Sequence, residues 1–134
     1  MSELPSVGVL DTCTYIDLLD LETADLPERW ELAAVSLAEL HQGVSMAKDP
    51  FTRAARAEVL ASAARMFDPL PFDGNAVARY GTLVALTVAA GRDPRPRRMD
   101  LMIAATASSR NLPLYTRNPA DFRGLDDVLT VYSV

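Results

Sequence analysis

Four acidic residues that lie far apart in the chain each stand at the edge of an apolar run. Asp11 ends Gly-Val-Leu-Asp, Glu39 ends Ser-Leu-Ala-Glu, Asp100 opens Asp-Leu-Met-Ile-Ala-Ala, and Asp121 ends Asn-Pro-Ala-Asp. An acid at the edge of a core is costly to desolvate, and such acids usually bind a hard cation or move protons. We therefore predict that the four carboxylates converge on one metal site.

The donor types define which cation that site would take. Carboxylate oxygens select Mg²⁺ or Mn²⁺, and the chain has no Cys/His set with zinc spacing. Each acid also has a purely structural explanation: Asp11 and Glu39 could cap helices, Asp100 could complement a helix dipole, and Asp121 could belong to a turn. Their joint placement favours the metal site, because gathered like charges are tolerated mainly when a divalent ion neutralises them.

Other catalytic schemes lack the residues they need. His41 is the only histidine, which excludes a two-histidine ribonuclease mechanism within one chain. Cys13 is the only cysteine, and we expect it to be a small core residue rather than a nucleophile. The sequence contains no nucleophile elbow, P-loop or dinucleotide-binding fingerprint.

Length and composition predict one soluble, cytoplasmic domain spanning residues 1–134, since 49% of the residues are hydrophobic and no apolar run is long enough to cross a membrane. The net charge of −5 argues against nucleic acid as a partner. However, four arginines directly precede Asp100, namely Arg92, Arg95, Arg97 and Arg98. Phosphate binding and simple amino-acid usage both remain open as explanations of this cluster.

Short apolar runs alternate with helical patterns along the whole chain. The sequence predicts strands at 7–10, 32–35, 112–116 and 128–132, with 69–72 as an edge strand. Helices are predicted after Asp11, after a capping box at Ser36, from Pro50, from Asp73 to Gly91, and around Asp100. This alternation predicts an α/β fold with a parallel sheet, helices on both faces, and ligands bound at the carboxyl ends of the strands.

Four segments, taken in order, resemble the successive motifs of PIN-domain nucleases, and most nearly those of VapC-type toxins. These segments are Val-Leu-Asp11-Thr12, Ser36-Leu-Ala-Glu39, Asp100-Leu-Met-Ile-Ala-Ala and Thr116-Arg117-Asn118-Pro-Ala-Asp121. The resemblance covers essentially the whole chain. It implies a three-layer α/β/α fold with a central parallel sheet of four or five strands. It also implies a Mg²⁺- or Mn²⁺-dependent endoribonuclease that forms a homodimer and is inhibited by a cognate antitoxin, which inserts a peptide near the active site.

Carried over by position, the resemblance makes Asp11 and Asp100 the metal ligands, Glu39 the second acidic position, and Thr116 a residue that borders the site. Many relatives have an acid where this chain has Asn118, so here Asp121 is expected to take the fourth acidic role. Asn118 then serves as a neutral ligand or hydrogen-bond donor.

We expect Thr116, Arg117 and Asn118, together with Arg97 and Arg98, to contact the RNA substrate. Two alternatives stay open: a catalytically idle PIN-like binding module, and a metal-dependent phosphoesterase acting on a small substrate. An open, arginine-rimmed groove would favour RNA, whereas a closed pocket would favour a small molecule.

Overall fold

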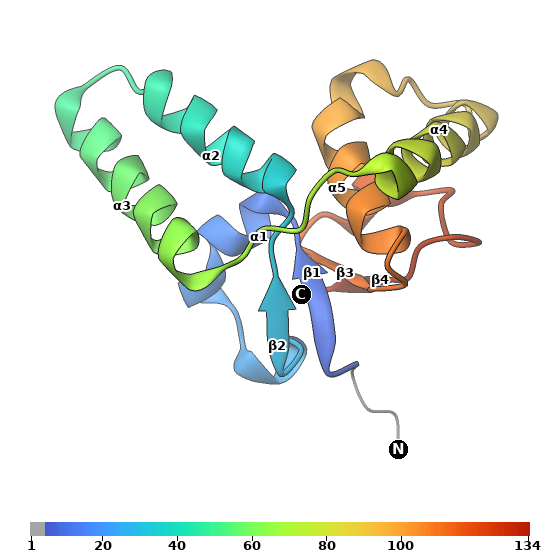
Figure 1. Ribbon diagram of the computed structural model, residues 1–134, viewed down its shortest axis with the longest axis horizontal. Helices are drawn as coiled ribbons and strands as arrows, with labels where there is room; N and C mark the ends of the chain where they lie inside the picture. Colours follow the sequence, from blue (N-terminus) through green and yellow to red (C-terminus); the bar gives the residue numbers. More distant parts are fainter. Residues whose placement is uncertain (1–4) are drawn as a thin grey trace.

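The computed structural model describes residues 5–134, so residues 1–4 of the predicted domain lie outside the described residues. Its centre is a four-stranded sheet in the order β2-β1-β3-β4 (Figure 1). The strands are β1 (Val7–Leu10), β2 (Arg29–Glu31), β3 (Leu114–Thr116) and β4 (Val131–Ser133). All three neighbouring pairs run parallel, which confirms the predicted sheet.

The helices form two arms that rise from the sheet (Figure 1). One arm pairs α2 (Ala34–Ser45) with α3 (Pro50–Met66), and the other pairs α4 (Gly74–Ala89) with α5 (Arg98–Ser108). A short helix, α1 (Thr12–Ile16), follows β1 directly. Four 3-10 turns complete the described chain: η1 (Leu18–Asp20), η2 (Thr23–Asp25), η3 (Arg95–Arg97) and η4 (Pro119–Phe122).

Each face of the sheet supports its own core, because neighbouring residues of a strand point to opposite faces. Val9 of β1 and Leu114 of β3 pack with the apolar side chains of α4 and α5. Leu10 and Tyr115, the next residues of the same strands, pack instead with side chains of α1, α2 and α3. The molecule is therefore the three-layer α/β/α structure that the resemblance implied.

Close packing between β1 and β3 fixes the end of β3. A side-chain carbon at Gly8 would overlap the ring of Tyr115, so only glycine fits there. The Tyr115 ring also stacks on Tyr132 of β4, with 5.0 Å between ring centroids. Because its neighbour is held on both sides, Thr116 leaves the strand in a defined direction toward the site.

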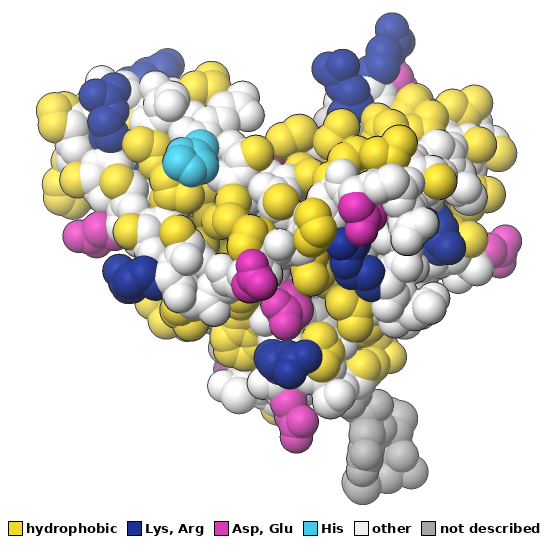
Figure 2. All heavy atoms as spheres, viewed as in Figure 1, with side chains coloured by type: hydrophobic (Ala, Val, Ile, Leu, Met, Phe, Trp, Pro, Cys, Tyr) yellow, Lys and Arg dark blue, Asp and Glu magenta, His cyan; other side chains and the backbone are white. Residues whose placement is uncertain are grey.

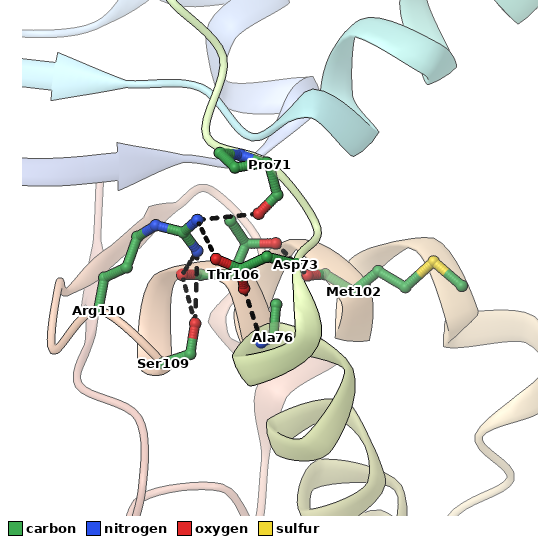
Figure 3. Close-up of polar contacts among 7 residues, drawn as sticks. All are labelled: Pro71, Asp73, Ala76, Met102, Thr106, Ser109 and Arg110. Carbon is green, nitrogen blue, oxygen red and sulfur yellow. Dashed lines mark hydrogen bonds and ion pairs between the residues drawn. The ribbon is translucent and has the colours of Figure 1, made fainter.

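Arg110 joins the end of α5 to the start of α4 (Figure 3). One guanidinium nitrogen, Nη2, donates to the Pro71 carbonyl at 2.9 Å and to Asp73 Oδ2 at 3.2 Å. The other, Nη1, donates to the Thr106 carbonyl at 3.0 Å. Asp73 Oδ1 accepts the Ala76 N–H at 3.0 Å, which confirms the predicted helix cap. We call this set the α4–α5 latch.

The predicted strand at 32–35 and the capping box at Ser36 are both wrong. The second strand lies earlier, at Arg29–Glu31, and α2 already begins at Ala34 with Ala33 as an N-cap that makes no side-chain hydrogen bond. Leu32 and Ala33 are fully buried, but they lie in the connection between sheet and helix. Burial alone made this run look like a strand, whereas an edge strand carries polar side chains.

The remaining differences are at element ends. The third and fourth strands are shorter than predicted, and the proposed edge strand at 69–72 is reduced to an isolated bridge between Ala33 and Leu70. Among the described residues, no helix combines the length and apolar character that crossing a membrane requires.

Candidate active site

Asp11 lies where β1 ends and α1 begins, and both of its carboxylate oxygens are held. Oδ1 accepts the Thr14 N–H at 3.1 Å, which makes Asp11 the N-cap of α1. Oδ2 accepts the Thr116 hydroxyl, from the end of the neighbouring strand, at 2.6 Å. The side chain is buried, with 5% of its surface exposed. Asp11 is thus a fixed, desolvated acid at the carboxyl edge of the sheet.

Glu39 approaches the same edge from α2. Its Oε1 accepts the Thr12 hydroxyl at 2.6 Å, and Thr12 Oγ1 also lies 3.0 Å from Ser36 Oγ. Glu39 therefore does not serve as the capping-box partner of Ser36, since the side chains of both residues turn toward Thr12 and the helix begins before Ser36. The structural explanation of Glu39 as a cap is excluded.

Asp100 lies in the first turn of α5 and is half-buried. Burial, and then the negative charges of Glu39, Asp11 and Asp121, raise the pKa of its carboxyl from 3.8 to about 6, against the opposing charge of Arg97. The four predicted acids therefore share one electrostatic environment, although they come from the β1–α1 junction, α2, α5 and η4.

The carboxylates do not form a closed cage. Within residues 5–134, no three His, Cys, Asp or Glu side chains lie close enough together to hold a metal ion between them. The four acids thus share one electrostatic environment without enclosing an ion in this way, and metal ligation by Asp11 and Asp100 stays a prediction. The donor chemistry nevertheless suits Mg²⁺, which is usually bound by one or two carboxylates and completed by water and substrate phosphate. Asp11 is buried and Asp100 is half-buried at this edge of the sheet.

The predicted substrate-binding residues differ in their burial and in the groups that they contact. Thr116 is fully buried and supports Asp11, and its own oxygen accepts the Asn118 N–H at 3.0 Å. Arg97 is half-buried near Asp100, and its Nη1 donates to the Asp93 carbonyl at 2.9 Å. Arg98 is exposed and donates to the Arg95 carbonyl at 3.1 Å. Of the predicted substrate-binding arginines, Arg97 is thus the one whose charge acts on Asp100.

Arg117 is paired with an acid outside the predicted four. Its guanidinium pairs with Asp17 at 3.2 Å, beyond the end of α1. Its backbone N–H donates to Thr14 Oγ1 at 3.1 Å, which ties the segment after β3 to the first turn of α1.

An open groove of about 440 Å³ runs beside Glu39. Its lining comes from α1, α2 and α3, and consists of Thr12, Cys13, Ile16, Glu39, Leu40, Gly43, Arg56 and Val59. The expectation that Cys13 is a core residue is wrong, because its side chain is exposed in this groove. Burial and then the charges of Asp11, Asp100 and Glu39 raise the pKa of the Cys13 thiol, which disfavours the thiolate that a nucleophile needs.

The two helical arms leave a notch between them, and the space-filling view shows it floored largely by hydrophobic side chains (Figure 2). Basic side chains stand at the ends of both arms (Figure 2). Exposed cations at these ends are Lys48, Arg53 and Arg56 on one arm, and Arg95 and Arg98 on the other. The arrangement is an acidic site near the sheet edge with positive charge farther out.

Sequence reasoning missed the small polar residues that support the acids. Thr12, Thr14 and Ser36 are all buried: the Thr12 hydroxyl, next to Ser36, donates to Glu39, and the Thr14 backbone N–H donates to Asp11. Nothing in their spacing distinguishes them from ordinary core threonines and serines, because Thr12 reaches its partners across 24 and 27 residues of chain. Only the Asp-Thr dipeptide at the end of the first strand was a usable signal.

A parallel α/β/α domain that gathers four carboxylates at the carboxyl edge of its sheet defines the PIN-like nuclease class that the motifs predicted. No family model matches the chain. It is 40% identical to Ribonuclease VapC5 of Mycobacterium tuberculosis over 98% of this chain and 96% of that protein. It is 39% identical to Ribonuclease VapC8 of the same species over 75% of this chain and 90% of that one.

Solved structures similar to this chain include one from the same family as its sequence relatives. The crystal structure of VapBC-5 from Mycobacterium tuberculosis, a member of the VapBC family of toxin-antitoxin systems, matches with a TM-score of 0.83 and 38% identity. That match covers 97% of this chain and 98% of the other. FitAcB from Neisseria gonorrhoeae matches with a TM-score of 0.71 and 26% identity, over 95% and 96% of the two chains. The chain belongs to the VapC family of ribonucleases.

Proposed function

We infer that this protein is an endoribonuclease, the toxin of a toxin–antitoxin pair, and that it hydrolyses RNA phosphodiester bonds at Asp11, Glu39, Asp100 and Asp121. The observation that carries the proposal is the position of Asp100 in a chain of the VapC family: burial and the charges of Glu39, Asp11 and Asp121 together raise the pKa of its carboxyl to about 6. Separate structural roles would not require acids from four parts of the chain to lie within one another's electrostatic field, whereas a common site does.

Asp11 and Asp100 would hold Mg²⁺ or Mn²⁺ with their carboxylate oxygens. When bound, the cation supplies positive charge for the phosphate oxygens and acidifies the attacking water. Asp11 is already oriented for this task, because Thr14 and Thr116 fix its two oxygens. Asp121 adds negative charge near Asp100, and Asn118 lies beside it on the same turn.

Glu39 accepts the proton of the attacking water. Its Oε1 is occupied by the Thr12 hydroxyl, and among the described residues no hydrogen bond engages Oε2. Oε2 is therefore the oxygen available to a water molecule. Glu39 also lines the open groove, so water and substrate can reach it from solvent.

The open groove and notch support an RNA substrate over a small molecule. Phosphates of a bound strand would meet Arg97 and Arg98 on one arm and Arg56 on the other, while Arg117 lies at the edge where Asp17 holds it. A net charge of −5 is compatible with this, because basic side chains stand at the ends of both arms.

VapBC-5 of Mycobacterium tuberculosis, whose matched chain is 38% identical to this one, is a member of the VapBC family of toxin–antitoxin systems, and we assign this protein an antitoxin partner on that basis. Homodimer formation and a cytoplasmic location stay predictions; light scattering of the purified protein tests the first, and cell fractionation the second.

The deciding experiment is cleavage of total cellular RNA by the purified protein with Mg²⁺ or Mn²⁺, with EDTA, and with Asp100→Asn prepared identically. We expect discrete fragments that require both the cation and Asp100, and sequencing of their ends would identify the target. Cleavage that survives in Asp100→Asn would refute the site. The absence of cleavage by folded, metal-supplied protein would favour the small-substrate phosphoesterase or the idle binding module.

A further inference from the structure

The buried hydroxyl groups of Ser36 and Thr12 form a chain of hydrogen bonds that ends at Glu39. Thr12 Oγ1 lies 2.6 Å from Glu39 Oε1 and 3.0 Å from Ser36 Oγ. Thr12 is 8% exposed and Ser36 is fully buried, so water does not compete for these hydrogen bonds. The three residues come from the first turn of α1 and from one face of α2, and they meet where β1 ends.

The direction of these hydrogen bonds follows from the single proton that each hydroxyl group can donate. A threonine hydroxyl has one proton to donate, and a carboxylate can only accept. The short contact to Glu39 therefore uses the Thr12 proton, and Ser36 must donate its own proton to Thr12. The order Ser36 to Thr12 to Glu39 strengthens each bond, because a hydroxyl that accepts a hydrogen bond becomes a better donor.

Asp11 is held by the same device. The Asn118 N–H donates to Thr116 Oγ1 at 3.0 Å, and the Thr116 hydroxyl donates to Asp11 Oδ2 at 2.6 Å. In both places a buried threonine accepts one hydrogen bond and donates a short one to a carboxylate of the site. A single such contact is a common packing solution, but its repetition on two acids of one site indicates that orientation of the carboxylates is the purpose.

We propose that Thr12 is a positioning residue that acts through Glu39: its hydroxyl, supported by Ser36, fixes the Glu39 carboxylate so that Oε2 faces the attacking water. The inference rests on the proposed role of Glu39 as the proton acceptor. A free glutamate side chain samples many rotamers, and catalytic geometry depends on sub-ångström placement. Removing the Thr12 hydroxyl should therefore lower kcat while leaving the fold and substrate binding in place.

The test compares isosteric variants. Thr12→Val keeps the shape of the side chain and loses the hydroxyl, whereas Thr12→Ser keeps the hydroxyl. We expect kcat for cleavage of a defined RNA to fall about 10- to 100-fold in Thr12→Val, with KM within about twofold, and to recover in Thr12→Ser. Ser36→Ala, which removes only the supporting donor, should lower kcat by a smaller factor.

Thr87→Val is the matched control. Thr87 is a buried threonine of α4 whose hydroxyl donates to the Leu83 carbonyl at 2.8 Å, one turn earlier in its own helix. Its replacement removes a buried hydroxyl without touching the acids, and should leave kcat unchanged. Melting temperatures of all variants, measured in EDTA, separate loss of positioning from loss of folded protein.

A double-mutant cycle with Glu39→Gln shows whether Thr12 acts through Glu39. If it does, Thr12→Val adds little to the loss already caused by Glu39→Gln, because residues that act as a unit are not additive. Full additivity, or a kcat for Thr12→Val equal to that of the parent, would overturn the inference.

Failure of the proposed function would look different, since the parent protein itself would then not cleave RNA. If Thr12→Val melts well below the parent, the comparison of Ser36→Ala with the parent decides instead. A loss of kcat in Ser36→Ala that disappears in the Glu39→Gln background supports the proposal that Ser36 and Thr12 act through Glu39. An unchanged kcat in Ser36→Ala refutes it.

Discussion

At the scale of single residues, Asp100 shows that the site is built at the expense of stability. Its carboxyl has a pKa of about 6 in the folded chain, against 3.8 as the reference value for an unperturbed Asp. A folded state with the higher pKa binds a proton more tightly than the unfolded state does. Ionised Asp100 therefore destabilises the metal-free fold at pH values above about 6, and this cost disappears as the pH falls toward 4.

Asp100→Asn should therefore stabilise the metal-free protein at pH 7.5 while it abolishes RNA cleavage. The amide removes the buried charge and its repulsion by Glu39, Asp11 and Asp121, which is worth on the order of 1 to 3 kcal/mol. Thermal unfolding in EDTA at pH 7.5 and pH 4.5 measures this effect. The gain should be fully present at the higher pH and reduced to about a third at the lower one, because pH 4.5 still lies above the reference pKa of 3.8.

Asp68→Asn serves as the control, since Asp68 is an exposed acid outside the site. Its melting temperature should track that of the parent at both pH values. If Asp100→Asn were less stable than the parent at pH 7.5, the carboxylate would have to be engaged in a favourable contact, and the repulsive field described here would be wrong.

The sequence located the acids of the site but not the groups that orient them. An acid at the edge of an apolar run is visible in one dimension, because burial of a charge is rare and needs a reason. A buried threonine is common, and its role depends on which carboxylate it meets in three dimensions. Thr12 and Thr116 could therefore be understood only after β1, β3 and α2 had been placed side by side.

At the scale of elements, prediction succeeded where a local signal defines the boundary. Asp49 before Pro50 and Asp73 before Gly74 each cap the helix that follows, as their sequences indicate. The second strand was misplaced because Arg29–Glu31 is polar and lies at the sheet edge, where Arg29 pairs with Glu31 at 3.4 Å. Its pairing with β1 is a long-range contact that a short sequence window does not contain.

The segment around η3 should contribute unequally to RNA binding. Arg95 is held by Asp93 through hydrogen bonds of 3.0 to 3.2 Å, whereas Arg97 and Arg98 bond only to backbone carbonyls. We expect Arg97→Gln and Arg98→Gln each to reduce the slope of log affinity against log salt by about 0.7, the value for one phosphate contact of a single strand. Fluorescence anisotropy with labelled RNA and the inactive Asp100→Asn protein measures the slope.

Arg95→Gln is the matched control for that experiment, and it should change the slope by less, because the Arg95 charge is already compensated by Asp93. Equal slopes for all three variants and the parent would mean that this segment does not contact RNA phosphates.

The α4–α5 latch should stabilise the fold without taking part in catalysis. Arg110→Ala should lower the free energy of unfolding by about 1 to 2 kcal/mol, because charged hydrogen bonds to the Pro71 carbonyl and to Asp73 are lost. Urea unfolding measures the loss, and kcat should remain that of the parent.

Two variants of Asp73 separate the cap from the ion pair. Asp73→Asn keeps a capping side chain and weakens only the pair with Arg110, so it should cost less than Asp73→Ala, which removes both. Equal stability of Arg110→Ala and the parent would show that the latch is dispensable.

At the scale of the whole molecule, the site lies where the two helical arms meet the sheet. Glu39 comes from one arm, Asp100 from the other, and Asp11 from the sheet edge between them. Any change in the separation of the arms therefore changes the distance between Glu39 and Asp100. The sequence predicted the alternating α/β order that creates this arrangement, but it contained no information on how far apart the arms stand, because side-chain packing on each sheet face sets that distance.

The two hydrophobic cores on opposite faces of the sheet also determine whether the protein unfolds in one cooperative transition or in two. Trp30, the only tryptophan, packs on the α1–α3 side, so its fluorescence senses one core alone. Far-UV circular dichroism senses helices on both sides. Because β1 and β3 supply alternate side chains to both cores, loss of one core frees strands that the other needs. The two signals should therefore change together in a single cooperative transition, and separate midpoints would mean that each arm melts as an independent unit.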